Sequence, residues 1–164
     1  MRALILFLFT MVLSISLFAQ KPIVKDGEIV LNGKSIAKIE KEGCKAFSPN
    51  CEFYISSLDS QPLINVIADV IDDPYSNHKR GEMPAKIPYL RFSFTGFEQV
   101  CEMRNPSLLL TKEKDIARIV HRLIKDGALD EVAVENFIKV NGTPITDMLE
   151  RSSSKPEINI NIRR

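Results

Sequence analysis

Alternating apolar and polar residues in the first half of the chain predict an antiparallel β-sheet. The clearest strand is Tyr89–Thr95, where Leu or Phe occupies every second position, the pattern of one buried and one wetter face. The same reasoning predicts further strands at Glu28–Leu31, Lys34–Lys41, Glu52–Leu58, Leu63–Ile71 and Glu98–Met103. Asp26-Gly27 and Asn32-Gly33 are typical of hairpin turns, because type I′ turns require positive φ at both central residues.

The spacing of apolar residues changes to a helical period after the sheet. The apolar positions from Ile116 to Ile124 follow the i, i+3, i+4, i+7 rule of one helix face. We expect Thr111 to cap this helix and Gly127 to end it in a left-handed conformation.

Two shorter helices are predicted after Gly127. The first runs from Glu131 to about Val140, with Asp130 as its N-cap and Asn141-Gly142 as its end. The second begins at Thr143-Pro144, because proline is favoured at the first helical position, and continues to about Glu150.

These elements define the expected fold class and domains. The chain is read as α+β: an antiparallel β-meander of about six strands, then two or three helices packed on one face. The expected division is a signal peptide at 1–19, one domain at 20–151, and a linker with a candidate C-terminal strand at 152–164. The strand is predicted because Ile158, Ile160 and Ile162 alternate with polar residues.

The first nineteen residues have the order of a secretory signal peptide. Arg2 precedes an apolar run that ends at Phe18, and the small Ala19 precedes Gln20. We expect cleavage after Ala19 and a periplasmic or secreted protein that is not an integral membrane protein. The alternative is an uncleaved anchor, because the run is near the lower length limit for a span. Both place the remaining chain outside the cytoplasm.

Charge and size limit the class of function. The whole chain of 164 residues has 22 basic and 21 acidic side chains, and cleavage would remove only the basic Arg2. The mature protein is then neutral, whereas nucleic-acid-binding domains usually carry a strong basic excess. No nucleic-acid partner is therefore predicted for this single domain, and no cofactor is predicted because no phosphate-cradling Gly-rich loop is present.

Three cysteines follow the signal segment, and an oxidising compartment favours one bridge among them. Cys44 and Cys51 lie on either side of a short loop between two predicted strands, so they are expected to face each other and bond. Cys101 is expected to be a free, small core residue. The alternatives are a bridge to Cys101 and three reduced cysteines.

The polar segment 72–88 is the candidate binding site. It is long for a connection between strands, and it contains Tyr75, His78, Lys79 and Arg80, a group suited to contacting an anion. The other histidine, His121, is expected to be a solvated helix residue. The two histidines and the neighbouring acidic residues match no trusted metal-ligand spacing, and no metal or catalytic site is predicted.

Three classes of function remain open from the sequence. The leading interpretation is an exported binding or envelope-associated module without catalysis, whose partner is an unknown ligand or envelope protein. The second is an extracytoplasmic hydrolase with its site at the 72–88 loop. The third is an assembly subunit joined by β-strand addition through Ile158, Ile160 and Ile162. Internal pairing of that strand with its own sheet is favoured over addition to a neighbour.

Overall fold

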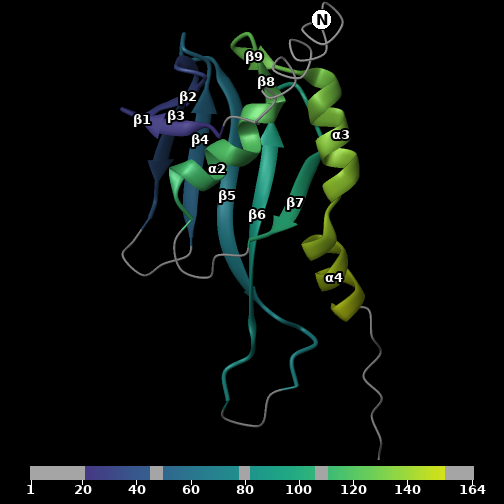
Figure 1. Cartoon of the computed structure of the whole chain (residues 1–164). Helices are drawn as coiled ribbons and strands as arrows, with labels where there is room; N and C mark the ends of the chain where they lie inside the picture. The colour runs from purple at the N-terminus through teal and green to yellow at the C-terminus, as the bar shows by residue number, and fades with distance from the viewer. Residues whose placement is uncertain (1–20, 45–49, 78–81, 106–110, 154–164) are drawn as a thin grey trace, which may run out of the picture.

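The computed structural model describes residues 21–44, 50–77, 82–105 and 111–153. Within these ranges, seven antiparallel strands form one sheet in which each strand pairs with the next along the chain (Figure 1). They are β1 (Ile23–Lys25), β2 (Glu28–Leu31), β3 (Lys34–Glu42), β4 (Cys51–Ser56), β5 (Pro62–Asp72), β6 (Lys86–Phe94) and β7 (Val100–Arg104). The α+β meander is confirmed, with seven strands instead of about six, because the residues before Asp26 also pair.

The hairpin turns have the predicted backbone. Asp26 and Asn32 have φ of 51° and 56°, and the glycines that follow them also have positive φ. Both positions of each turn are therefore left-handed, as a type I′ hairpin requires.

The first predicted helix is shorter than expected. Helix α2 (Glu113–Val120) is followed by a 3-10 turn (His121–Leu123) and then by a small hairpin of β8 (Ile124–Lys125) and β9 (Ala128–Leu129). Gly127 is therefore wrong as a helix stop, because it forms the turn of this hairpin with a φ of 82°. Leu123 at the end of the 3-10 turn and Ile124 at the start of β8 are still buried against the core.

The predicted cap of that helix is also wrong. The N-cap position belongs to Lys112, which makes no side-chain capping bond. Thr111 is buried instead, and its Oγ1 accepts a hydrogen bond of 2.7 Å from Asn105 Nδ2. Its hydroxyl connects the end of the sheet to the start of α2.

The two remaining helices follow the predicted boundaries closely. Asp130 caps α3 (Glu131–Asn141) by accepting a hydrogen bond of 3.0 Å from the Ala133 N–H. Gly142 has a φ of 57° and separates α3 from α4 (Pro144–Ser153). Helix α4 continues past Glu150 into the segment expected to be a linker.

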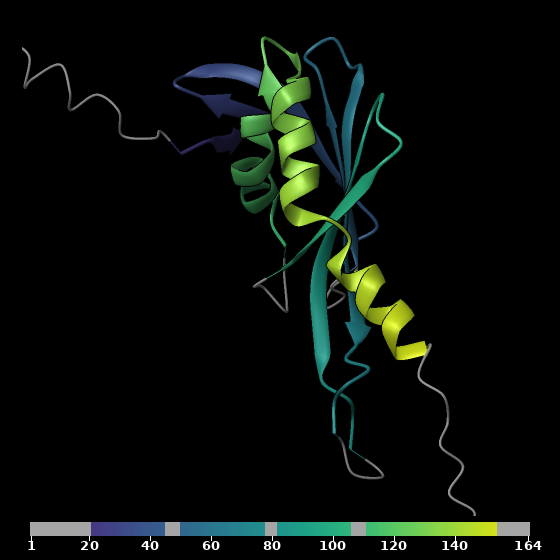
Figure 2. The same ribbon diagram turned by 90° about the vertical axis from the view of Figure 1, so that its right-hand side faces the viewer.

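Helices α2 and α3 pack on one face of the sheet, where the main core lies (Figures 1 and 2). Phe53 and Phe92 are fully buried at the centre of this face. Phe137 of α3 meets Phe92 edge-on, with ring centroids 5.2 Å apart. Aromatic contacts therefore join the helical layer to the sheet.

Helix α4 begins on the other face of the sheet. Successive residues of a strand point to opposite faces, and Cys101 belongs to the main core, so Glu102 points away from that core. Its carboxylate nevertheless is only 2% exposed, because it accepts hydrogen bonds from the N–H groups of Ile145 and Thr146 at 3.0 and 2.9 Å. The Thr146 hydroxyl donates to the same carboxylate at 2.8 Å. Glu102 thus holds the first turn of α4 against β7.

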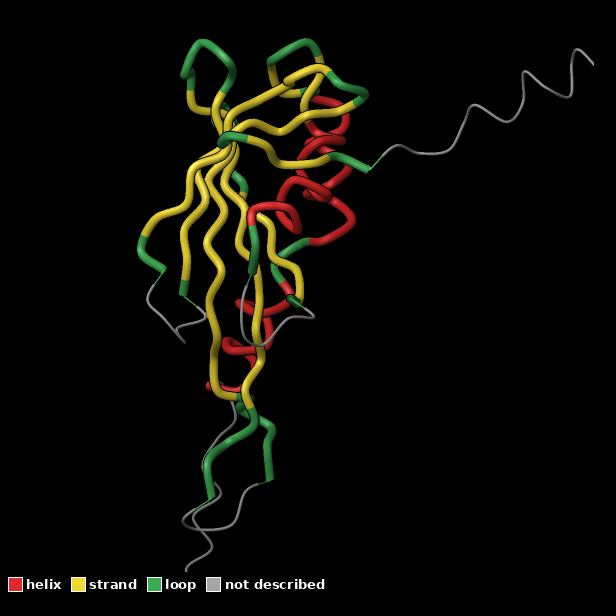
Figure 3. Tube along the Cα trace, turned by 60° about the vertical axis from the view of Figure 1, so that its left-hand side comes forward, coloured by secondary structure: helices red, strands yellow, loops and turns green. Residues whose placement is uncertain are grey.

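The β5–β6 hairpin extends beyond the neighbouring strands (Figure 3). Its pairing continues to Asp72 and Lys86, whose side chains form an ion pair. The connection is therefore residues 73–85, shorter than the 72–88 loop expected from composition. Pro88 lies within β6 opposite Val70, because pairing with β5 holds this polar stretch extended.

Three predicted features lie outside the described residues. These are the signal peptide at 1–19, the side chains of His78, Lys79 and Arg80, and the alternating Glu157–Ile162 segment. Among the helices that are described, none has the length and apolar character needed to cross a membrane.

Candidate functional site

The predicted disulfide is present between Cys44 and Cys51. Their Cα atoms are 4.6 Å apart, within the range that a bridge requires. Cys101 is free and fully buried, as expected. Burial, with a smaller effect of the neighbouring Glu102 charge, raises the pKa of the Cys101 thiol to about 12. A thiol this weakly acidic is a packing group rather than a nucleophile.

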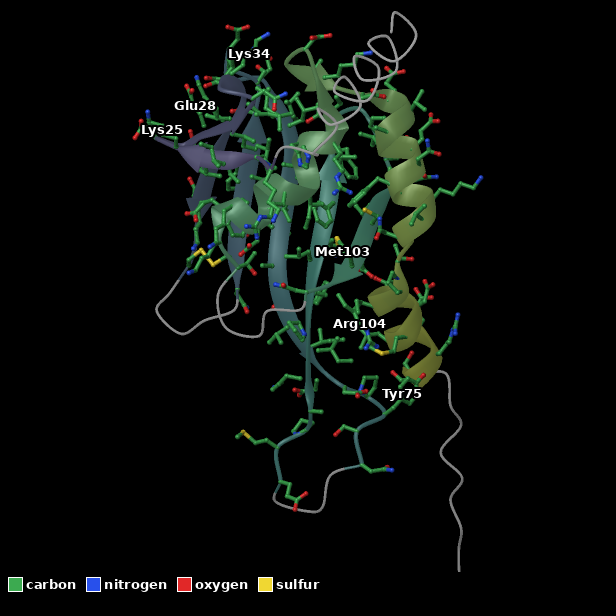
Figure 4. The ribbon with its side chains drawn as sticks, viewed as in Figure 1. Lys25, Glu28, Lys34, Tyr75, Met103 and Arg104 are labelled. Carbon is green, nitrogen blue, oxygen red and sulfur yellow. A yellow bond between two sulfur atoms is a disulfide. The ribbon has the colours of Figure 1, made fainter. Side chains whose placement is uncertain are left out.

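Of the four residues predicted to bind an anion, only Tyr75 is described. Its side chain is 46% exposed, and its backbone N–H donates to Asp73 Oδ1 at 2.9 Å. Figure 4 shows Tyr75 near the C-terminal end of α4, at the opposite end of the molecule from Lys34. The anion site therefore stays a prediction, and Tyr75 alone does not form a pocket.

A groove on the sheet face opposite the main core is the candidate site that the structure adds. Four outward-facing side chains lie in one cross-strand row, because Glu40 is opposite Tyr54, Tyr54 is opposite Asn65, and Asn65 is opposite Ser93. They line a hollow of about 440 Å³, together with residues at the ends of these strands. The row draws on β3, β4, β5 and β6, so its geometry is fixed by four paired strands.

The hollow exists because small side chains occupy its floor. Ser56 is directly opposite Pro62, and Ser93 ends the row on β6; these two small side chains line the groove together with the bulkier Tyr54 and Pro62. Lys38 lies at one end, where its Nζ donates to Ser60 Oγ at 3.0 Å. The rigid strands therefore surround a small space that side chains of this sheet do not fill.

Several polar groups of the groove have no partner inside the described parts of the chain. Asn65 Oδ1 is buried and accepts no hydrogen bond there. Among the same residues, no hydrogen bond or ion pair reaches the Glu40 carboxylate or the Ser93 hydroxyl. A buried acceptor without a donor costs about 1–3 kcal/mol, so a ligand that supplies a donor after the Asn65 amide turns toward the groove would be favoured.

Tyr54 gives the groove a fixed aromatic side. Its hydroxyl donates to Glu52 Oε2 on the same strand, while its side chain remains 39% exposed. That hydrogen bond raises the pKa of Tyr54, with smaller contributions from burial and from the charges of Glu52 and Glu42. The phenol is therefore held protonated and oriented.

A second, larger hollow lies where three hairpins meet. It measures about 870 Å³ and is bordered by the β2–β3, β4–β5 and β8–β9 turns. Leu31, Ile36, Leu58 and Leu63 supply its apolar side chains. Charged groups such as Lys34, Asp59 and Asp126 also line it, but among the described residues no buried polar atom without a partner lies there, so the sheet-face groove is the more specific candidate.

Sequence reasoning missed the groove although its alternation was visible. The predicted strands place Tyr54, Asn65 and Ser93 at polar positions between apolar ones. The sequence pattern does not give the register between strands, and it is this register that brings the three side chains side by side. The available local signal of this site was Asn65, a polar residue between two apolar residues of a predicted central strand.

No cluster of three or more metal-ligating side chains occurs in the described ranges. Comparison with known proteins gives no relative: no family model, curated protein or solved structure matches the chain significantly. The groove must therefore be interpreted from its own chemistry.

Proposed function

We propose that the protein is an exported, non-catalytic binding module that holds a small polar ligand in the sheet-face groove. The single observation that carries the proposal is the row of Glu40, Tyr54, Asn65 and Ser93 around a hollow, with a buried acceptor left unpaired. Hydrogen-bonding groups held on paired strands are positioned more precisely than groups on loops, which favours selective binding.

Export is proposed from the sequence and is supported by the bridge. The order of Arg2, an apolar run and Ala19 is that of a signal peptide. A disulfide between Cys44 and Cys51 is typical of an oxidising compartment and rare in the cytosol. The ligand would then be met in the periplasm or outside the cell.

The test is a fragment screen followed by NMR of the isotope-labelled protein. Small polar fragments should shift the backbone amide signals of Glu40, Tyr54, Asn65 and Ser93 in a saturable manner. The variant Ser93→Tyr should abolish these shifts, because its ring fills the hollow. Val100→Tyr is the matched control, since Val100 is opposite Ser93 on the same face but does not line the groove.

Two results would overturn the proposal. One is a set of fragments that binds Ser93→Tyr as well as the natural protein. The other is a screen whose fragments all map outside the groove, for example at the hairpin-tip hollow. Both variants should keep the natural melting temperature, because the substituted side chains face away from the main core.

A further inference from the structure

The groove offers a ligand more hydrogen-bond acceptors than donors. The Glu40 carboxylate can only accept hydrogen bonds, and Asn65 Oδ1 is an acceptor without a donor among the described residues. Among the described residues, Lys38 supplies an ammonium beside the groove, and it already donates to Ser60 at the rim. A ligand rich in donors therefore complements this surface better than one rich in acceptors.

The carboxylates on this face have the same preference, while the cation on this face nearest the groove, Lys38 opposite Ser56, lies at its end. Glu40, Glu42 and Glu52 all point away from the main core, and Glu42 is directly opposite Glu52. Like charges at directly opposed positions destabilise a strand pair. On the other side of Glu52 the row continues through Ile67 to Arg91, whose cation lies 3.8 Å from Glu102. A bound cation would relieve this repulsion, whereas a neutral ligand would leave it unchanged.

The aromatic side of the groove completes the argument. Tyr54 is held by its hydrogen bond to Glu52, and its side chain is 39% exposed. The face of a tyrosine ring attracts a cation within about 6 Å of its centroid. Rotation of the Asn65 amide about its terminal torsion, which is broad and nearly two-fold, would turn Oδ1 toward the same ligand.

We infer that the ligand of the groove carries an organic cation, an ammonium or guanidinium group, which lies between the Glu40 carboxylate and the Tyr54 ring. This inference rests on the proposed binding function of the same groove and names its ligand class. Asn65 Oδ1 and Ser93 Oγ accept further hydrogen bonds from the cation. Lys38 and Ser60 close one end of the site.

The experiment compares three five-carbon probes of equal length: 1,5-diaminopentane, 1,5-pentanediol and glutarate. Each is titrated into the isotope-labelled full protein while backbone amide signals are followed by NMR. The diamine should produce saturable shifts at Glu40, Tyr54, Asn65 and Ser93 that weaken as salt is added. The diol and the dicarboxylate should produce no saturable shift there at the same concentration.

Two variants distinguish binding of the diamine in the groove from its weak attraction to acidic surface in general. Glu40→Gln keeps the size of the side chain and should weaken diamine binding about fivefold, the effect of one exposed charge pair. Glu150→Gln on α4 is the matched control and should leave the affinity unchanged. Glu98, Glu131 and Glu135 line another acidic hollow, so their signals report binding to acidic surface in general.

Each other outcome has a definite meaning. Saturable groove shifts with the diol or glutarate equal to those with the diamine would overturn the cation inference but leave the proposed binding function intact. Diamine shifts spread equally over Glu98, Glu131 and Glu135 would overturn the inference in favour of weak general attraction. No groove shift with any probe would also overturn it, and the fragment screen would then decide the proposed function independently.

Discussion

Replacement of Glu102 by alanine should destabilise the protein by removing the connection between β7 and α4. The carboxylate accepts hydrogen bonds from two backbone N–H groups and one hydroxyl of the first α4 turn, at 2.8–3.0 Å. The Glu102 carboxylate therefore acts as an N-cap for α4, although it belongs to strand β7. Because Glu102 is 2% exposed, its removal also leaves a small cavity.

The magnitude follows from which donors are left without a partner. The Ile145 N–H is buried, so losing its acceptor costs about 1–3 kcal/mol. Thr146 is half-buried, and water can replace part of its two bonds. The cavity left by the buried side chain adds about 1 kcal/mol, so the expected total is about 3 kcal/mol. The corresponding fall in melting temperature is about 10 °C for a domain of this size.

Urea unfolding followed by circular dichroism measures the free energy, and hydrogen exchange locates the change. Glu102→Gln keeps the shape and an acceptor, so it should lose about half as much. Glu98→Ala, at an exposed turn, should change the free energy by less than about 0.5 kcal/mol. The reasoning is refuted if Glu102→Ala unfolds within about 0.5 kcal/mol of the natural protein, or if α4 exchanges no faster.

Four further predictions address other parts of the chain. Reduction of Cys44–Cys51 should lower the free energy of unfolding by about 2.5 kcal/mol, the loop-closure entropy of so short a bridge, measured by urea unfolding with and without dithiothreitol. Equal midpoints would contradict it. Because the Cys101 pKa is raised from 9.0 to about 12, the thiol favours folding below pH 9, and this contribution is lost as pH rises from 9 to 12. Between pH 9 and 12, the urea midpoint of Cys101→Val should therefore fall less than that of the natural protein. Plots of midpoint against pH that run parallel for the two proteins would refute the raised pKa of Cys101. N-terminal sequencing of protein recovered outside the cytoplasm should begin at Gln20, whereas full-length protein in the cytosol would end the export prediction. Amides in 158–162 should exchange slowly in the monomer if that segment pairs with its own sheet. If the segment instead adds to a neighbouring protein, their exchange should become slow only at high concentration or with a partner. Fast exchange under every condition would exclude both.

The sequence by itself determined the features that depend on neighbours along the chain. Alternation located the strands, Asp26-Gly27 and Asn32-Gly33 located the turns, and Asp130 located the start of α3. The Cys44–Cys51 bridge belongs to the same group, because a hairpin brings its two flanking residues together. In each case a few residues set the local backbone, and little outside that segment competes.

Only the tertiary structure decided the features that depend on pairing partners distant in sequence. Lys86–Pro88 contains proline and lies in a segment read from composition as a loop, yet it is strand because β5 pairs with it. Glu102 sits at an outward strand position, yet it is buried because α4 returns to cover it. The groove needs Glu40, Tyr54 and Ser93 in one row, and a shift of one residue in register would send a side chain to the opposite face. That register is set by the combined packing of the whole sheet, so no single segment encodes the site.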